Sequence, residues 1–184
     1  MGIVVTVLLA IAVWLIVVYT GAYNVAATDR HADLARWTLD TTMHRSVSSR
    51  AEALDLPENF TPELIAAGGP RYASMCAHCH AGPGLERAGW ASGMRPIPPH
   101  LTEAAAGWEP QEVFWIVQNG IKMSGMPAFG PDHGDEAVLA ITAFVKQLPG
   151  MTPEQYQEFT GGGGHGHGDE ASESGGHHSS GGTE

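Results

Sequence analysis

The alternation of apolar and polar residues divides the chain into segments of different character. Residues 3–19 are apolar with a single Thr, and the uncharged run continues to Thr28 before Asp29 brings the first charge. An apolar helix of about 20 residues is long enough to cross the hydrocarbon core of a bilayer. We therefore expect residues 1–28 to form a transmembrane anchor.

A cleaved signal peptide is the alternative for this segment. Val25-Ala26-Ala27 resembles a small-residue cleavage site, but no Lys or Arg precedes the apolar run, and the run exceeds the usual length for a signal of about 7–15 residues. These features favour an uncleaved anchor. Arg30 and Arg36 follow the run, and the positive-inside rule alone would place the rest of the chain in the cytoplasm, in conflict with the chemistry below.

Residues 29–56 show a helical pattern in which apolar residues recur every three or four positions, at Leu39, Met43, Val47, Ala51 and Leu54. Pro57 breaks the pattern. We interpret residues 29–60 as a helical linker. Two roles stay open for it: a spacer that lifts a domain off the membrane or docks a partner subunit, and an amphipathic helix that folds onto its own domain.

Three further helices are predicted between residues 61 and 160. Thr61-Pro62-Glu63 combines a capping residue, a proline for the first turn and an acid near the positive helix end. Residues 110–119 form the second helix, which Gly120 stops, and residues 135–147 form the third. One side of the third helix is apolar, with Val138, Ile141, Phe144, Val145 and Leu148.

The end of the chain, residues 161–184, lacks Leu, Ile, Val, Phe, Trp and Tyr and is rich in Gly and His. Such a segment cannot bury enough apolar surface to offset the cost of ordering, so we expect a disordered tail. Its histidines, which are suited to weak binding of copper, nickel or zinc, are His165, His167, His177 and His178. A solvated tail without a role is the favoured interpretation.

The formal net charge of −11 argues against a nucleic-acid partner, which would require a basic surface. Residues 61–160 carry five Lys and Arg against ten Asp and Glu. From this total, we expect the partner of the domain to present a basic patch.

The two cysteines of the chain, Cys76 and Cys79, are followed directly by His80. A structural zinc site would require a second Cys pair or a spaced His pair, which the chain lacks. A thioredoxin-like dithiol would require a βαβ pattern, whereas the residues around these cysteines are helical in character. Cys-x-x-Cys-His is the attachment signature of c-type haem, in which the thiols join the haem vinyls and the histidine binds iron.

A second axial ligand is expected in residues 119–130, where Met123 and Met126 stand three apart. Three glycines disfavour a helix in this stretch, and Pro127 fixes the backbone just after Met126. A methionine in a constrained loop can present its thioether to a metal. Ligation by His and Met raises the reduction potential of a haem.

Together these motifs resemble the class I monohaem cytochromes c that are anchored by one N-terminal helix. The resemblance covers about residues 69–156, including Gly69-x-x-Tyr72, the attachment motif, Met126-Pro127-Ala128-Phe129 and a closing helix. It implies an all-α fold, with the class I cytochrome c fold of residues 61–160 around one covalent haem c, preceded by a transmembrane helix and a helical linker. It also implies Met126 as the second axial ligand.

The resemblance implies further details around the haem. His80 should donate its other ring nitrogen to a backbone carbonyl, in the turn 81–84 or in the proline run 96–99. Aromatic residues should line the haem, at Tyr72, Trp115, Phe129 and Phe144, with Phe144 packed across Gly69 and Tyr72. A helix should begin at Pro70. His78 is expected to be an exposed polar residue without a role.

The expected function is electron transfer without a catalytic residue. A membrane-tethered cytochrome would pass single electrons between respiratory partners such as a quinol-oxidising complex, a dehydrogenase or a terminal oxidase. Because maturation requires export, the domain should face the periplasm from a single-pass anchor in a bacterial inner membrane. Two alternatives are a haem sensor or peroxidase-like enzyme with a labile Met ligand, and a fixed cytochrome subunit of a larger membrane oxidoreductase.

Overall fold

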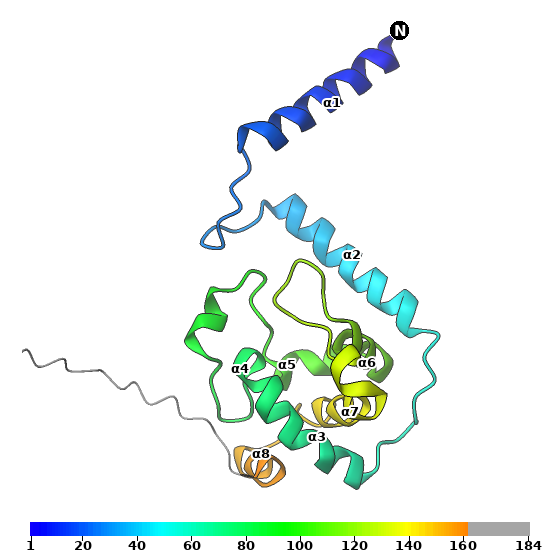
Figure 1. Cartoon of the computed structure of the whole chain (residues 1–184), viewed down its shortest axis with the longest axis vertical. Helices are drawn as coiled ribbons and strands as arrows, with labels where there is room; N and C mark the ends of the chain where they lie inside the picture. The colour runs from blue at the N-terminus through cyan, green and yellow to red at the C-terminus, as the bar shows by residue number, and fades with distance from the viewer. Residues whose placement is uncertain (162–184) are drawn as a thin grey trace, which may run out of the picture.

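The computed structural model describes residues 1–161. Within that range the chain folds into helices without a β-strand, which confirms the all-α prediction (Figure 1). The elements in chain order are α1 (Gly2–Thr20), α2 (Asp33–Ala51), α3 (Pro62–Met75), α4 (Ala77–His80), the 3₁₀ helix η1 (Gly89–Gly93), α5 (Leu101–Ala104), the 3₁₀ helix η2 (Ala105–Gly107), α6 (Pro110–Asn119), α7 (Gly130–Val145) and α8 (Pro153–Thr160). Of the predicted tail, residues 162–184 lie outside the described residues.

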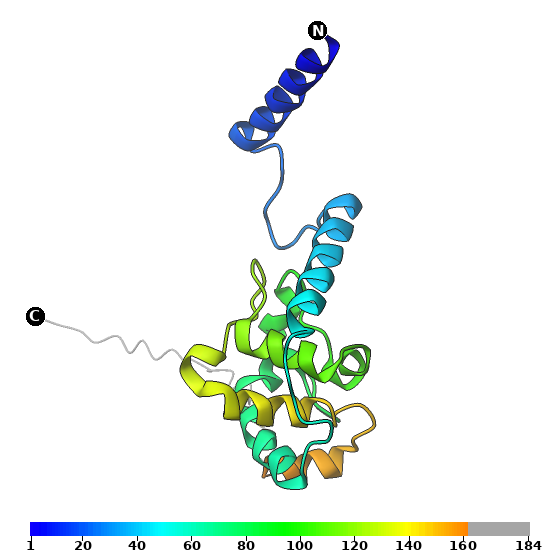
Figure 2. The same cartoon turned by 90° about the vertical axis from the view of Figure 1, so that its right-hand side faces the viewer.

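Helix α1 stands apart from the helices that follow α2 in both views (Figures 1 and 2). A stretch of 18 of its 19 residues has a mean hydropathy of 2.8, and none of the residues of α1 is buried. By length and composition, α1 is able to cross a membrane, as a retained anchor or as the apolar part of a signal sequence.

The C-terminal half of α2 packs on α6. Val47 and Ala51 are each 1 % exposed, the Ser48 hydroxyl donates a hydrogen bond to Glu112, and His44 stacks on Trp108 with ring centroids 4.5 Å apart. This half therefore folds onto its own domain. The helix ends at Ala51, before the expected break at Pro57, and its N-terminal half is exposed apart from Ala35.

Helices α3 and α7 cross in close contact at a glycine. A Cβ atom on Gly68 would lie 2.1 Å from the carbonyl oxygen of Ala140, so a larger residue would force the two helices apart. The ring of Phe144 packs beside Tyr72, with centroids 5.4 Å apart. We expected Phe144 to pack on Gly69, but it packs on Gly68. Gly69 instead faces the backbone of Phe159 in α8.

The expectation that a helix begins at Pro70 was wrong. Helix α3 starts at Pro62, where Thr61 caps it by accepting a hydrogen bond from the backbone N–H of Leu64, and continues through Pro70 to Met75. Proline removes one helical hydrogen bond, which leaves the carbonyl of Ala66 without its usual donor. Because Ala66 is exposed, water is able to replace that donor.

The buried core lies between α3, α6, α7 and α8. Helix α6 has the predicted bounds, and the predicted apolar side of α7 is buried. Helix α7 starts at Gly130, but Gly134 has a non-helical conformation and divides it, so the part after the kink begins at the predicted residue 135. Helix α8 was not predicted, although Thr152 and Gln155 form a capping box at its start that the sequence displays. The buried residue of α8 is Tyr156, which packs against Tyr72 and Phe144.

Candidate haem site

The two cysteines lie where α3 passes into α4. The backbone N–H of Cys76 donates to the carbonyl of Tyr72, and the N–H of His80 donates to the carbonyl of Cys76, so a helical backbone holds the whole motif. Cys76 is 6 % exposed and Cys79 is half-buried. Both thiols are free rather than joined in a disulfide, which leaves both sulfurs available for thioether bonds.

Burial makes these cysteines poor thiolates. It raises the pKa of Cys76 to about 12, with a further contribution from Cys79. Burial also raises the pKa of Cys79, against the opposing charge of Arg87. A dithiol that exchanges disulfides needs a nucleophile with a lowered pKa. The environment of this motif therefore does not suit thiol–disulfide exchange.

The residue directly after the motif is held in a strained conformation. Ala81 has φ 62° and ψ −163°, a region that residues with a side chain rarely adopt. The buried hydroxyl of Tyr72 donates a 2.7 Å hydrogen bond to the Ala81 carbonyl. Tyr72 thus fixes the direction in which the chain leaves His80.

The imidazole of His80 is oriented by a backbone carbonyl. Its Nδ1 lies 2.8 Å from the carbonyl oxygen of Pro99, so the proton resides on Nδ1 and Nε2 keeps a lone pair. Of the two segments expected to supply this acceptor, the proline run does so. Burial lowers the pKa of His80, with the Pro99 bond opposing it, and therefore favours the neutral imidazole that binds a metal.

The proline run is in turn held by a cation. Arg87 donates a hydrogen bond to the carbonyl of Pro98, next to the acceptor of His80. The N–H of Ala88 donates to the backbone carbonyl of His78 at 2.9 Å, which ties this loop to the attachment helix. His78 is half-buried, so the expectation that its side chain is exposed was wrong.

The loop that carries the two methionines has a defined backbone. The N–H of Met126 donates to the Ser124 hydroxyl at 3.1 Å, and the carbonyl of Met126 accepts from Ile121 at 3.2 Å. The N–H of Phe129 donates to Val117 at 3.0 Å and returns the loop to α6. Hydrogen bonds on both sides thus hold the backbone of Met126.

Gly120 is required where this loop starts. Its φ of 65° and ψ of −175° suit glycine, and a Cβ atom there would lie 2.6 Å from the carbonyl carbon of Pro127 and 2.7 Å from the carbonyl oxygen of Met126. The start of the loop therefore passes directly against its end. The sequence marks Gly120 only as a helix stop, not as this contact.

The two methionines differ in environment. Met126 packs against the core cluster, whereas Met123 is 86 % exposed and has φ 59°. Only Met126 is therefore placed toward the interior. A third methionine, Met94, joins the two loops: a Cβ atom on Gly125 would lie 1.7 Å from its terminal methyl carbon.

The aromatic residues expected to line a haem have different burial. Tyr72 and Phe144 are fully buried, Phe129 packs partly buried against the core, and Trp115 is half-buried outside the core cluster. Phe114, which was not among the predicted residues, is 6 % exposed and belongs to the core.

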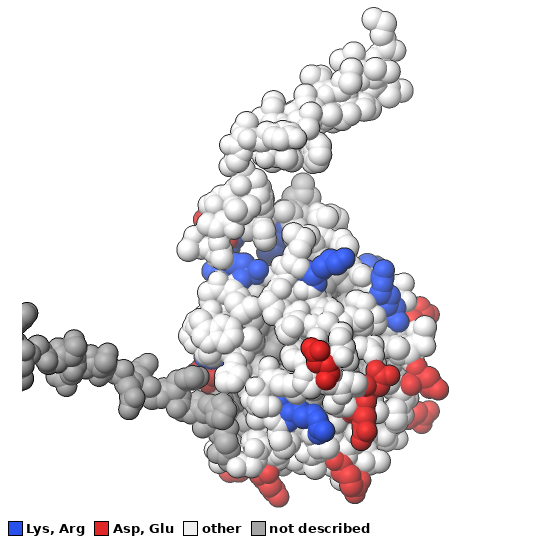
Figure 3. Space-filling view, in the orientation of Figure 1, with Lys and Arg blue, Asp and Glu red and all other residues white. Residues whose placement is uncertain are grey.

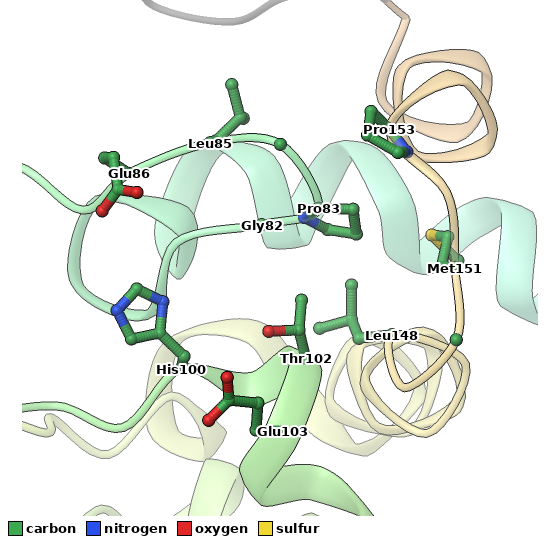
Figure 4. Close-up of a pocket in the computed structure, with 12 residues that line it drawn as sticks. Gly82, Pro83, Leu85, Glu86, His100, Thr102, Glu103, Leu148, Met151 and Pro153 are labelled. Atoms are coloured by element: carbon green, nitrogen blue, oxygen red, sulfur yellow. The ribbon is translucent and has the colours of Figure 1, made fainter.

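A separate cavity of about 570 Å³ lies between the turn after His80, α5 and the connection from α7 to α8 (Figure 4). Glu86, His100 and Glu103 gather at one end of it, and Leu148, Met151 and Pro153 at the other. No predicted haem ligand lines this cavity, so it is distinct from the candidate haem site.

The residues present fit a covalently bound haem. The donor set combines two free thiols, a neutral imidazole whose Nδ1 proton is committed to a carbonyl, and an inward-placed thioether. Sulfur and imidazole donors are the protein ligands that haem iron takes in cytochromes c. Cys76, Cys79, His80 and Met126 are the residues that would hold the group.

Comparison with known families gives a match over this region. Residues 63–145 match the family model described as cytochrome C oxidase, cbb3-type, subunit III. Neither the curated proteins nor the solved structures gave a match. The match begins one residue into α3 and ends with the last residue of α7, so it contains the attachment motif and both loops. This match supports a haem-containing electron-transfer cytochrome. Residues 63–145 are therefore a cytochrome c domain of the cbb3 type, similar to the class I monohaem cytochromes c.

Proposed function

We propose that this chain is a membrane-tethered carrier of single electrons with one covalent haem c. Cys76 and Cys79 would attach the haem, and His80 and Met126 would be the ligands of its iron. A bound haem supplies an iron that changes between the ferrous and ferric states. The observation that carries the proposal is the orientation of His80 by the Pro99 carbonyl, which leaves Nε2 available beside two free thiols.

The protein residues have three tasks in this proposal. Pro99 orients His80 and keeps its Nε2 unprotonated. The hydrogen bonds around Met126 keep its thioether in place, so that no site opens for an added ligand. The buried residues of α3, α6 and α7 exclude water, which disfavours the charged ferric form and raises the reduction potential.

The proposed location follows from α1 and from haem attachment. Helix α1 is retained as a single-pass anchor in a bacterial inner membrane, and the haem domain faces the periplasm. Tethering keeps the domain near membrane partners, for which a quinol-oxidising complex, a dehydrogenase and a terminal oxidase are the candidates.

Optical spectra of the purified membrane protein, oxidised and reduced, test this proposal. A weak far-red band from sulfur to ferric iron should be present in the wild type and in Met123→Ala, and absent in Met126→Ala. Met123 is the matched control because it lies in the same loop and is exposed. A high-spin wild-type spectrum with rapid binding of carbon monoxide would instead support a sensor or peroxidase-like enzyme.

A second candidate, favoured by the description of the matching family, is a fixed cytochrome subunit of a larger membrane oxidoreductase. Extraction of membranes in mild detergent, followed by size separation with detection of haem, distinguishes the two. A free carrier migrates alone, whereas a fixed subunit remains with the proteins that it serves.

A further inference from the structure

The tip of the Met126 loop, residues 120–129, is shaped by hydrogen bonds within the loop itself. The N–H and the hydroxyl of Ser124 both donate to the carbonyl of Ile121, at 3.3 Å and 2.7 Å, and the N–H of Met126 donates to that hydroxyl. These bonds do not attach the tip to another element, and Gly125 at the tip is exposed. A segment with few outside contacts opens at a low cost in free energy, so a contact made by the tip affects the position of Met126.

A side chain from a distant part of the chain packs on this tip. The terminal methyl carbon of Met94 occupies the place that a Cβ atom on Gly125 would take, since the two atoms would lie 1.7 Å apart. Gly125 is not among the glycines of residues 1–161 that have a positive φ, so its φ does not require glycine. The absence of a side chain at position 125 therefore serves the contact with Met94 rather than the turn.

Met94 lies on the loop between α4 and α5, which also orients His80. The N–H of Met94 donates to the carbonyl of the fully buried Ala91 at 3.2 Å, and the carbonyl of Met94 accepts a 2.8 Å hydrogen bond from Arg95. Farther along this α4–α5 loop, the carbonyl of Pro99 accepts from His80. Met94 thus contacts the other loop from a fixed backbone, and one loop supports both proposed ligands.

Charge offers no attraction between the two loops. The α4–α5 loop carries Arg87 and Arg95, and the Met126 loop carries the exposed Lys122. The acid of the α4–α5 loop, Glu86, lines the separate cavity, and the ion pair found in residues 1–161 lies within α2. On the face shown in Figure 3, Lys and Arg gather mainly in the upper part of the domain, where both loops end in Figure 1. The contact that joins the loops is therefore the apolar one between Met94 and Gly125.

We propose that Met94 is a positioning residue for Met126, which it holds by packing on Gly125 at the tip of the Met126 loop. The inference rests on the proposed function, in which Met126 is a ligand of the iron. An added ligand reaches the position of Met126 only when this loop opens, so the Met94 contact determines how readily Met126 is replaced.

Competition with imidazole, a small ligand of ferric haem, tests this role in the full-length holoprotein. The far-red band of the ferric protein is followed while imidazole is added, and the concentration that removes half of the band is measured. Met94→Ala removes the contact, and Gly125→Ala displaces the methyl group of Met94. Each substitution should lower this concentration several-fold, because the loop then opens more readily.

Gly93→Ala and Met123→Ala are the matched controls. Gly93 lies beside Met94 on the α4–α5 loop, and nothing lies within 4 Å of a Cβ atom there. Met123 lies two residues before Gly125, and its side chain is 86 % exposed. Both controls should stay near the wild type. Equal effects of Gly125→Ala and Gly93→Ala, or a Met94→Ala variant that resists imidazole as the wild type does, would overturn the inference.

A paired substitution separates this contact from general stability. The sulfur of Met94 lies 3.5 Å from the place of a Cβ atom on Gly125, which is an ordinary van der Waals distance. A leucine side chain ends where that sulfur stands, so Met94→Leu combined with Gly125→Ala moves one methyl group from one loop to the other and restores the contact. The double variant should need more imidazole than Gly125→Ala alone. A double variant that needs no more than Gly125→Ala would count against the inference.

Failure of the proposed function would have a different signature. A band that is lost in Met94→Ala and retained in Met126→Ala would make Met94 the sulfur ligand and would overturn the proposed ligation, as would a wild type without the band. Where the wild type shows the band and Met126→Ala lacks it, the ligation stands, and the imidazole concentrations alone decide the role of Met94.

Discussion

The hydroxyl of Tyr72 donates a 2.7 Å hydrogen bond to the carbonyl of Ala81, the residue that follows His80. This buried bond joins the middle of α3 to the end of the attachment motif. The hydroxyl of Tyr156 is also buried, but none of the described residues 1–161 forms a hydrogen bond with it. The two tyrosines, with ring centroids 6.2 Å apart, therefore provide a comparison within one core.

Tyr72→Phe should lower the free energy of unfolding by about 1–3 kcal/mol, because it leaves the Ala81 carbonyl buried without a donor. Tyr156→Phe should change it little, since the hydroxyl that it removes is unpaired. Denaturant unfolding of the holoprotein, followed by fluorescence, measures both. Equal losses in the two variants would contradict this assignment.

Ala81→Gly should stabilise the protein. The backbone conformation of Ala81 costs about 1–3 kcal/mol for a residue with a side chain, and glycine adopts it without strain. The greater freedom of glycine in the unfolded chain offsets about 0.5–1 kcal/mol of that gain. Thermal unfolding is the measurement, and a lower midpoint than that of the wild type would show that the Ala81 methyl group packs usefully.

Gly120→Ala should weaken the Met126 loop more than Gly134→Ala weakens α7. Both glycines have φ near 70° and extended ψ, so both substitutions introduce backbone strain of about 1–3 kcal/mol. Only at Gly120 would the new methyl group also meet the backbone of residues 126–128, whereas nothing lies within 4 Å at Gly134. The far-red band and the free energy of unfolding, measured for both variants, separate the contact from the strain.

Val47→Asp should release α2 from α6. It places a carboxylate where the side chain is 1 % exposed, at a cost of several kcal/mol unless the helix detaches. Leu39→Asp, in the same helix but at a position 46 % exposed, is the control. Limited proteolysis should cut the Val47→Asp variant between residues 52 and 60 much faster than the control. If both variants are cleaved at similar rates, the other contacts of α2 are sufficient to hold it on α6.

The local features of the sequence predicted much of this fold. Periodicity and capping residues located α6 with its observed bounds and the buried side of α7, because both signals act within one or two turns. Pro70 misled the prediction, since proline normally ends a helix interior. Its tolerance in α3 depends on the exposed position of Ala66, which no local pattern reveals.

The candidate site likewise has features that local sequence predicts and features that depend on tertiary contacts. The spacing of Cys76, Cys79 and His80 can be read from five consecutive residues. The carbonyl that accepts from His80 lies 19 residues further on, and two segments qualified for that role. The need for glycine at position 120 could not be predicted, because it arises where the start of the loop contacts the end of the loop. Such contacts depend on tertiary packing and had to come from the structure.

Only the C-terminal half of α2 packs on the haem domain, and this limits how far the domain can move from the membrane. If α1 is embedded as we propose, the twelve residues 21–32 extend to about 40 Å, and the exposed first ten residues of α2 add about 15 Å as a rigid arm. The length of this linker limits the distance from the membrane surface that the haem domain can reach. An acceptor protein whose electron-entry site lies farther from the membrane than this distance would not receive electrons from the domain.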